Sequence, residues 1–150
     1  MISNKTKYAL KAVLMLTDKY ASKEPVLIAE IAQKESIPKK FLESILLELK
    51  NKGFLQSKKG KGGGYLLARS PNQISFGEVI GIFENPFGAL PCLDVKANRR
   101  CDECKRGSAC GIQMVMQEVY RTTSSILNIT TFKDVYDRMR NTNQEAMYFI

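Results

Sequence analysis

Hydrophobic residues in the first half of the chain recur mostly at helical spacing. Ser3 or Asn4 can cap a first helix, whose shared buried face is formed by Ala9, Val13, Leu16 and Tyr20. A short second helix is predicted over residues 27–34, followed by a turn over 35–37. A third helix is predicted from Pro38, because proline lacks the N–H that would be unbonded in a first helical turn. Its apolar stripe is Phe41, Leu42, Ile45, Leu46 and Leu49.

Two short strands are predicted after the third helix. They cover residues 54–58 and 65–68, and a glycine-rich tip over 60–64 joins them into a hairpin. Ser75 and Glu78 then form the pattern of a capping box, which opens a fourth helix. Helix, short helix, turn, helix and hairpin in this order predict a winged helix-turn-helix.

The second half of the chain has a different pattern. Periodicity is lost from residue 85 to about 110, and a long helix is predicted beyond it. The apolar positions of this helix exceed what one small domain needs, so a dimer interface would use the surplus; they are Ile112, Val115, Val119, Ile126 and Leu127. Thr130 or Thr131 can cap a short last helix, after which a loosely ordered tail is expected.

The predicted fold class is mainly α with a small β-hairpin wing. A winged helix-turn-helix domain would occupy residues 1–84 and a cysteine-rich loop residues 85–111. The long dimerisation helix and the C-terminal helix would follow over 112–140, and the tail over 141–150.

Positive charge is concentrated in the predicted winged domain. The chain has 23 Lys and Arg against 15 Asp and Glu, a net charge of +8. Residues 1–80 contribute 14 basic and 7 acidic side chains (+7), and residues 81–150 contribute 9 and 8 (+1). Five lysines follow one another without an intervening acid: Lys50, Lys52, Lys58, Lys59 and Lys61. This pattern favours a surface that follows nucleic-acid phosphates over a merely solvated face.

The predicted third helix has the position of the one that enters the major groove of DNA in a helix-turn-helix. Pro38, Lys39 and Lys40 lie in its first turn, where the two lysines can reach guanine edges or phosphates. Glu43 can accept a hydrogen bond from a cytosine amino group, or it can pair with Lys39 or Lys40. Further candidate DNA contacts lie at the start of the chain and at the hairpin tip. These are Ser3, Lys5, Lys58, Lys59, Lys61, Gly62 and Gly63.

The hairpin tip can also be interpreted without DNA. A phosphate-binding nucleotide loop is disfavoured, because the residues around Lys61 lack both the spaced first glycine and the Ser or Thr that follows the lysine. A tight turn with a purely structural role remains open.

Composition excludes several classes of function. The chain has no histidine, which removes Ser-His-Asp and Cys-His catalysis and every zinc site that requires imidazole. Apolar runs fall far short of the ~20 residues that span a bilayer, and the N-terminus has no signal-peptide pattern. We therefore expect a cytoplasmic protein without a membrane partner, and most hydrolase mechanisms are excluded. Our prediction is a protein that is not an enzyme and has no small-molecule substrate.

Four cysteines lie within a 19-residue stretch, with the spacing Cys92-x8-Cys101-x2-Cys104-x5-Cys110. Four thiolates can complete an iron–sulfur cluster, 2Fe–2S or 4Fe–4S, or a tetrahedral zinc site. We favour the cluster, because structural zinc usually takes two Cys-x2-Cys pairs and this stretch has one. The thiols could instead carry out redox chemistry or be inert. A hypothesis from a different class of function is a thiol oxidoreductase that uses Cys101 and Cys104.

Four segments together resemble one family, the Rrf2 (IscR/NsrR-type) winged-helix transcription regulators. They are residues 7–10, 37–43, 60–67 and 129–132, and the resemblance covers roughly residues 1 to 135. It implies a homodimer that binds an imperfect palindrome in double-stranded DNA. In many members a cluster tunes this binding to iron–sulfur status, oxygen or nitric oxide, whereas other relatives have no cluster and act through partner proteins.

The resemblance extends to the cysteines. Cluster-binding members often carry three cysteines after the fourth helix, with five residues between the last two, as between Cys104 and Cys110. Cys92 takes the first position of that pattern. Cys101 is additional, and it implies a fourth thiolate in place of a non-cysteine ligand. Where some members use histidine this chain has Gln113, and where others use aspartate it has Tyr8.

The predicted function is a DNA-binding transcription regulator whose cysteine-ligated iron–sulfur cluster senses redox, nitric oxide or iron–sulfur status. The alternative is a DNA-binding regulator that holds structural zinc or no metal. Such a regulator would act as a thiol switch or through a partner protein.

Overall fold

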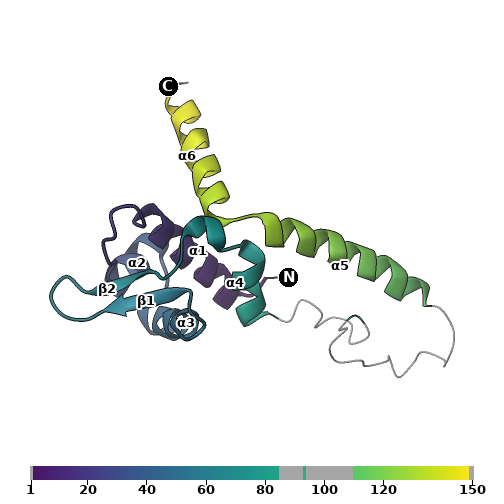
Figure 1. Cartoon of the computed structure of the whole chain (residues 1–150), viewed down its shortest axis with the longest axis horizontal. Helices are drawn as coiled ribbons and strands as arrows, with labels where there is room; N and C mark the ends of the chain where they lie inside the picture. Colours follow the sequence, from purple (N-terminus) through teal and green to yellow (C-terminus); the bar gives the residue numbers. More distant parts are fainter. Residues whose placement is uncertain (1, 85–92, 94–109, 149–150) are drawn as a thin grey trace.

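The computed structural model describes residues 2–84, 93 and 110–148. Within these residues the chain forms six α-helices, one short 3₁₀ helix and a two-stranded antiparallel hairpin (Figure 1). The elements are α1 (Asn4–Asp18), α2 (Ile28–Glu35), α3 (Lys39–Asn51), β1 (Leu55–Lys58), β2 (Gly64–Leu67), η1 (Pro71–Gln73), α4 (Phe76–Phe83), α5 (Gly111–Ile129) and α6 (Phe132–Tyr148). Helices α1 to α4 and the hairpin gather into one body, from which α5 and α6 extend in different directions (Figure 1).

The starts of α1 and α4 follow from hydrogen-bonding side chains at the predicted caps. The Ser3 hydroxyl accepts a hydrogen bond from the Thr6 N–H at 3.2 Å, which fixes the start of α1. At α4, the Glu78 N–H donates to the Ser75 hydroxyl at 3.1 Å, and the Ser75 N–H donates back to the Glu78 carboxylate at 2.8 Å. This confirms the predicted capping box. Pro38 is the N-cap of α3, so the helix begins one residue later than predicted.

A continuous apolar core lies between α1, α3, α4 and the hairpin. Its fully enclosed side chains include Val13, Leu16, Ile31, Leu42, Ile45, Leu46, Leu49 and Phe132. Each such side chain contributes about 1.5–3 kcal/mol through removal from water. Phe132 belongs to α6, and its ring stacks on Phe76 of α4 with ring centroids 4.4 Å apart. The core of the winged body is therefore completed by a residue from beyond α5.

Two apolar residues depart from the predicted buried faces. Tyr20 lies beyond the end of α1 and is 38% exposed, because the helix ends at Asp18 and the chain turns away. Phe41 is 43% exposed, because it lies at the edge of the α3 stripe rather than at its centre. The other four residues of that stripe are buried, as predicted.

The last helix is longer than predicted. Instead of leaving the helix near Asn141, the chain stays helical to Tyr148. No glycine or proline interrupts residues 141–148, and several of them are good helix formers. The predicted start is confirmed, because the Asp134 N–H donates to the Thr131 hydroxyl at 3.1 Å and the Thr131 N–H donates to the Asp134 carboxylate at 3.0 Å.

The hairpin is attached to the body through Val26. Leu55 pairs with Leu67 and Lys58 with Gly64 in the antiparallel register. Backbone hydrogen bonds of 2.8 Å in both directions join Val26 to Tyr65, so the chain before α2 runs alongside β2. Gly64 has φ +147°, and a Cβ there would overlap the Val26 carbonyl group. This position therefore requires glycine.

We expect Gly64→Ala to lower the free energy of unfolding by about 1–3 kcal/mol, because the added methyl group meets backbone that cannot move aside. Chemical denaturation measures this change. Gly81→Ala is the matched control, because a Cβ at Gly81 of α4 meets nothing within 4 Å. That control should stabilise the protein by up to roughly 1 kcal/mol through helix propensity. Equal effects of the two substitutions would contradict the steric argument.

Candidate nucleic-acid interface

Helix α3 presents one polar, solvent-facing side opposite its buried stripe. Lys39, Lys40 and Glu43 are all exposed on it, as predicted. The predicted option that Glu43 pairs with Lys39 or Lys40 is not realised, because none of the ion pairs among the described residues involves these three. A carboxylate and two ammonium groups are thus available together in the first turns of this helix.

Two apolar side chains of α3 share the solvent-facing region, and the sequence analysis missed their exposure. Phe41 packs edge-on against Tyr8 of α1, with ring centroids 5.9 Å apart and planes at 85°. Leu47 is 52% exposed. Leu47 does not fit the three- and four-residue spacing of the buried stripe, and this mismatch in the sequence could have predicted its exposure. Exposed apolar groups on such a helix can contact thymine methyl groups.

The hairpin carries the predicted lysines at its tip. Lys58, Lys59 and Lys61 are exposed, and among the described side chains none of them has an ion-pair partner. The hairpin is tied to α3, because the Lys50 ammonium donates to the Ser57 hydroxyl at 2.8 Å and the Phe54 N–H donates to the Leu49 carbonyl at 3.0 Å. The lysine tip and α3 therefore belong to one body (Figure 1).

The glycines of the tip differ in their surroundings. Gly60 and Gly62 have φ of +90° and +77°, which side-chain-bearing residues rarely adopt. Gly62 is exposed, whereas Gly63 is buried within the turn, where a Cβ would overlap the Lys58 carbonyl oxygen. Glycine is therefore required at position 63 for steric reasons, independently of any DNA contact.

The N-terminal candidates, Ser3 and Lys5, are engaged within the protein. The Lys5 ammonium forms a 2.6 Å ion pair with Glu48 of α3 and lies 4.9 Å from the centre of the Phe83 ring of α4. Ser3 caps α1 through its hydroxyl. Lys5 therefore links α1, the solvent-facing helix α3 and the end of α4.

Glu84 connects the end of α4 to the start of α1. Its Oε1 accepts hydrogen bonds from the Ser3 N–H at 2.9 Å and from the Thr6 hydroxyl at 2.5 Å. Hydrogen bonding from Ser3 and then from Thr6 lowers the pKa of Glu84 to about 2, because both stabilise the ionised carboxylate. Sequence analysis missed this contact, which joins residues 81 and 78 positions apart and leaves no local pattern.

Of the four predicted metal ligands, only Cys110 lies within the described residues. It is the half-buried N-cap residue of α5, and its carbonyl accepts a hydrogen bond from the Met114 N–H at 3.1 Å. Cys92, Cys101 and Cys104 lie outside the described residues. Within the part of the chain that is described, no three Cys, Asp or Glu side chains gather as a metal site would require.

Helix α5 has no buried residue along its 19-residue length. Its exposed large apolar side chains include Ile112, Met114, Val115, Val119 and Ile126. No described helix has both the length and the apolar character needed to cross a membrane. Such an apolar face is typical of an interface with another protein chain.

Comparison with solved structures shows the fold. T. potens IscR aligns with a TM-score of 0.74 at 22% identity, over 93% of this chain and 88% of its own. CymR of B. subtilis, titled a global cysteine regulator, aligns with a TM-score of 0.75 at 24% identity, over 92% of this chain and 97% of its own. The predicted winged, mainly helical fold class is confirmed.

Comparison of sequences shows the family. A family model described as "Rrf2: Iron-dependent Transcriptional regulator" matches residues 2–138. An rrf2-like HTH-type transcriptional regulator of Rhodobacter capsulatus is 39% identical, over 90% of this chain and 91% of its own. NsrR of Bacillus licheniformis is 30% identical, over 89% of this chain and 90% of its own. These relatives are regulators rather than enzymes, and this protein belongs to the Rrf2 family of transcriptional regulators.

Proposed function

We propose that the protein is a cytoplasmic, homodimeric regulator that binds an imperfect DNA palindrome and responds to the state of an iron–sulfur cluster. The observation that carries the DNA-binding part is the pairing of the exposed first turns of α3 with an exposed lysine tip on the same body. Lys40 and Glu43 read base edges in the major groove, and Lys58, Lys59 and Lys61 contact phosphates beside it.

A second copy of the chain covers α5. A palindromic site needs two recognition helices related by a two-fold axis, and the exposed apolar side of α5 offers a self-complementary surface for such a pair. Val115 and Val119, one turn apart, lie within that surface. Its burial in a dimer would supply the core that α5 lacks on its own.

The donor chemistry of the cysteine segment fits an iron–sulfur cluster. Cys92, Cys101, Cys104 and Cys110 provide four soft thiolate ligands in a chain without histidine. Cys110 lies at the N-terminus of a long helix, where the helix dipole favours an anionic ligand. When bound, such a cluster supplies iron that changes oxidation state or reacts with nitric oxide or oxygen.

The residues that follow α4 are linked to α3 through α1. Glu84 holds the start of α1 through Ser3 and Thr6, and Lys5 joins that start to Glu48 of α3. A shift of the chain after Glu84 therefore acts on the helix that reads DNA. DNA affinity changes only if the two forms of the protein bind DNA with different free energies, and this path provides the difference.

Binding of a palindromic duplex should weaken steeply with salt, since released counterions drive phosphate contacts. Lys59→Ala should reduce the slope of log K against log salt by roughly one unit. Lys133→Ala, which removes a lysine paired with Asp137 on α6, is the matched control and should leave the slope unchanged. Fluorescence anisotropy measures both slopes. A slope near zero for the unaltered protein would contradict DNA binding through these residues.

Anaerobically purified protein should contain iron and sulfide in matched amounts and sediment at twice the 16.9 kDa chain mass. Cys104→Ala should lose the metal and change DNA affinity, because one thiolate of the set is removed. Elemental analysis and anisotropy on the same samples measure both effects. One zinc ion per chain, without iron and sulfide, would mean that the cysteines form a structural zinc site and not a cluster. A metal-free Cys104→Ala protein with unchanged DNA affinity would exclude coupling between metal binding and DNA binding.

Glu84→Gln should weaken the link between α4 and α1. The ionised carboxylate stabilises the fold above the ordinary pKa of 4.5, and its contribution is lost as the pH falls through about 2. The variant should therefore be less stable at neutral pH, and the difference should disappear in acid. Denaturation at several pH values measures this. Glu24→Gln is the control, because Glu24 accepts no hydrogen bond from the described residues, and a pH-independent difference would contradict the assignment.

A further inference from the structure

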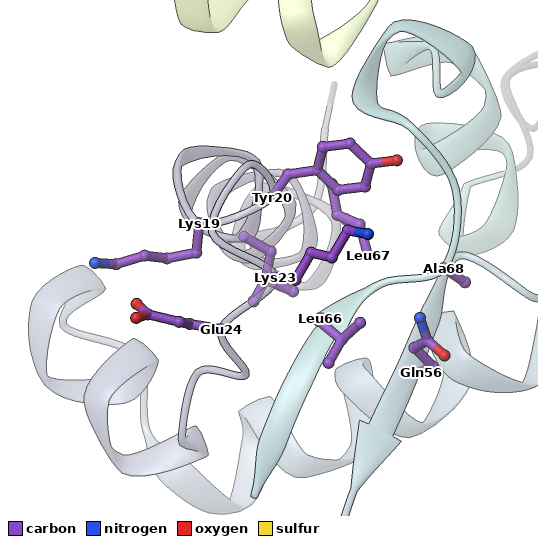
Figure 2. Close-up of a pocket in the computed structure, with 9 residues that line it drawn as sticks. Lys19, Tyr20, Lys23, Glu24, Gln56, Leu66, Leu67 and Ala68 are labelled. Atoms are coloured by element: carbon purple, nitrogen blue, oxygen red, sulfur yellow. The ribbon is translucent and has the colours of Figure 1, made fainter. Parts of the chain in front are cut away.

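A hollow of about 240 Å³ lies at the base of the wing. Its walls come from the turn after α1 and from the hairpin (Figure 2). Figure 2 shows Tyr20 and Lys23 extending from the turn above β2, with Leu66 and Gln56 on the hairpin side. Lys19 and Glu24 lie at the outer edge of the turn.

The hollow is built by backbone constraints rather than by one displaced side chain. Lys23 adopts φ +56°, an uncommon conformation for a residue with a side chain, which directs the turn back toward the hairpin. Three residues later, Val26 is bonded to Tyr65 of β2 in both directions. The segment from Lys23 to Val26 is therefore constrained at both ends, and this fixes the space between the turn and the hairpin.

The floor is apolar and the rim is polar. Leu16 and Leu67 are almost fully buried beneath it, and Leu66 is half-buried beside them. Among the described residues, the side chains of Lys23 and Gln56 have no hydrogen-bond or ion-pair partner. Both side chains are exposed to solvent, so they are free to contact a bound molecule. An apolar floor with a few polar groups at its rim is typical of a small-molecule site.

We propose that this hollow binds a small aromatic monocarboxylate. Its volume lies below the roughly 300–1,000 Å³ of sites for drug-sized ligands, so it suits a single ring. The ring would lie on Leu66 and against Tyr20, and the carboxylate would accept hydrogen bonds from the Lys23 ammonium and the Gln56 amide. Two lysines against one glutamate at the rim favour an anion over a cation, and the single Glu24 disfavours a dianion.

Occupancy of this site would bear on the wing. Leu66 and Gln56 are cross-strand partners in the hairpin that carries the lysine tip. A ligand that joins them to Lys23 holds the hairpin against the turn after α1. None of the lining residues belongs to the cysteine segment, so a ligand here would provide a second input to the proposed DNA-binding surface.

The test uses benzoate as the probe, added to the full-length protein without DNA, so that its outcome does not depend on the proposed DNA-binding function. Titration followed by backbone amide NMR should show saturable shifts confined to residues 19–24, 56 and 66–68, with millimolar affinity. Lys23→Gln should weaken binding about fivefold, as expected for loss of one exposed charge pair. Gln56→Phe should abolish binding by filling the hollow while leaving every charge in place.

Lys133→Gln is the control for general anion binding, because this lysine lies on α6 outside the hollow. It should leave the benzoate affinity unchanged. The proposal would be overturned by shifts that do not saturate, or by shifts spread over lysines across the surface. Equal loss of binding in the Lys23 and Lys133 variants would overturn it as well. With bound benzoate, DNA affinity should change by at least about twofold, and unchanged affinity would exclude a regulatory role.

Discussion

Burial of one face of α1 is the constraint on which the rest of the structure depends. Ala9, Ala12, Val13 and Leu16 are all enclosed, and α2, α3, α4, α6 and β2 pack around this helix. The two alanines let neighbouring backbones approach closely, and the larger side chains fill the space between them. Because α1 is shared by so many contacts, it fixes the position of α3 relative to the wing and to α4. A displacement of α1 therefore affects every element that packs against it.

The same helix gives the protein two separate ends at which a signal can act. At its start, Glu84 and Lys5 connect it to α4 and to α3. At its end, the turn through Lys23 runs beside the hairpin. The two ends lie beside different elements of the proposed DNA interface, α3 at the start and the hairpin at the end. If DNA binds as proposed, a change at the start of α1 acts on contacts to base edges and a change at its end acts on contacts to phosphates.

Local patterns in the sequence were enough to predict the fold order, the caps and the outward direction of the α3 lysines. Ser75 and Glu78 are three residues apart and signal their own pairing, so their geometry could be anticipated. Contacts between distant residues could not be anticipated in this way. Nothing near Glu84 in the chain indicates Ser3, and Phe41 packs against Tyr8 of another helix, which its own stripe does not reveal. The predicted metal ligands rested on cysteine spacing and on the family resemblance, and three of the four lie outside the described residues.

The position of Phe132 has a consequence for how the protein folds. This fully enclosed ring completes the core of the winged body, yet it follows the cysteine segment and α5 in the chain. A backbone bond of 3.0 Å from its N–H to the Ile74 carbonyl ties the chain back at the same place. The intervening residues therefore form a closed loop whose entropy is lost when the core assembles. Residues that lie far apart in the chain must therefore meet before the core of the winged body is complete.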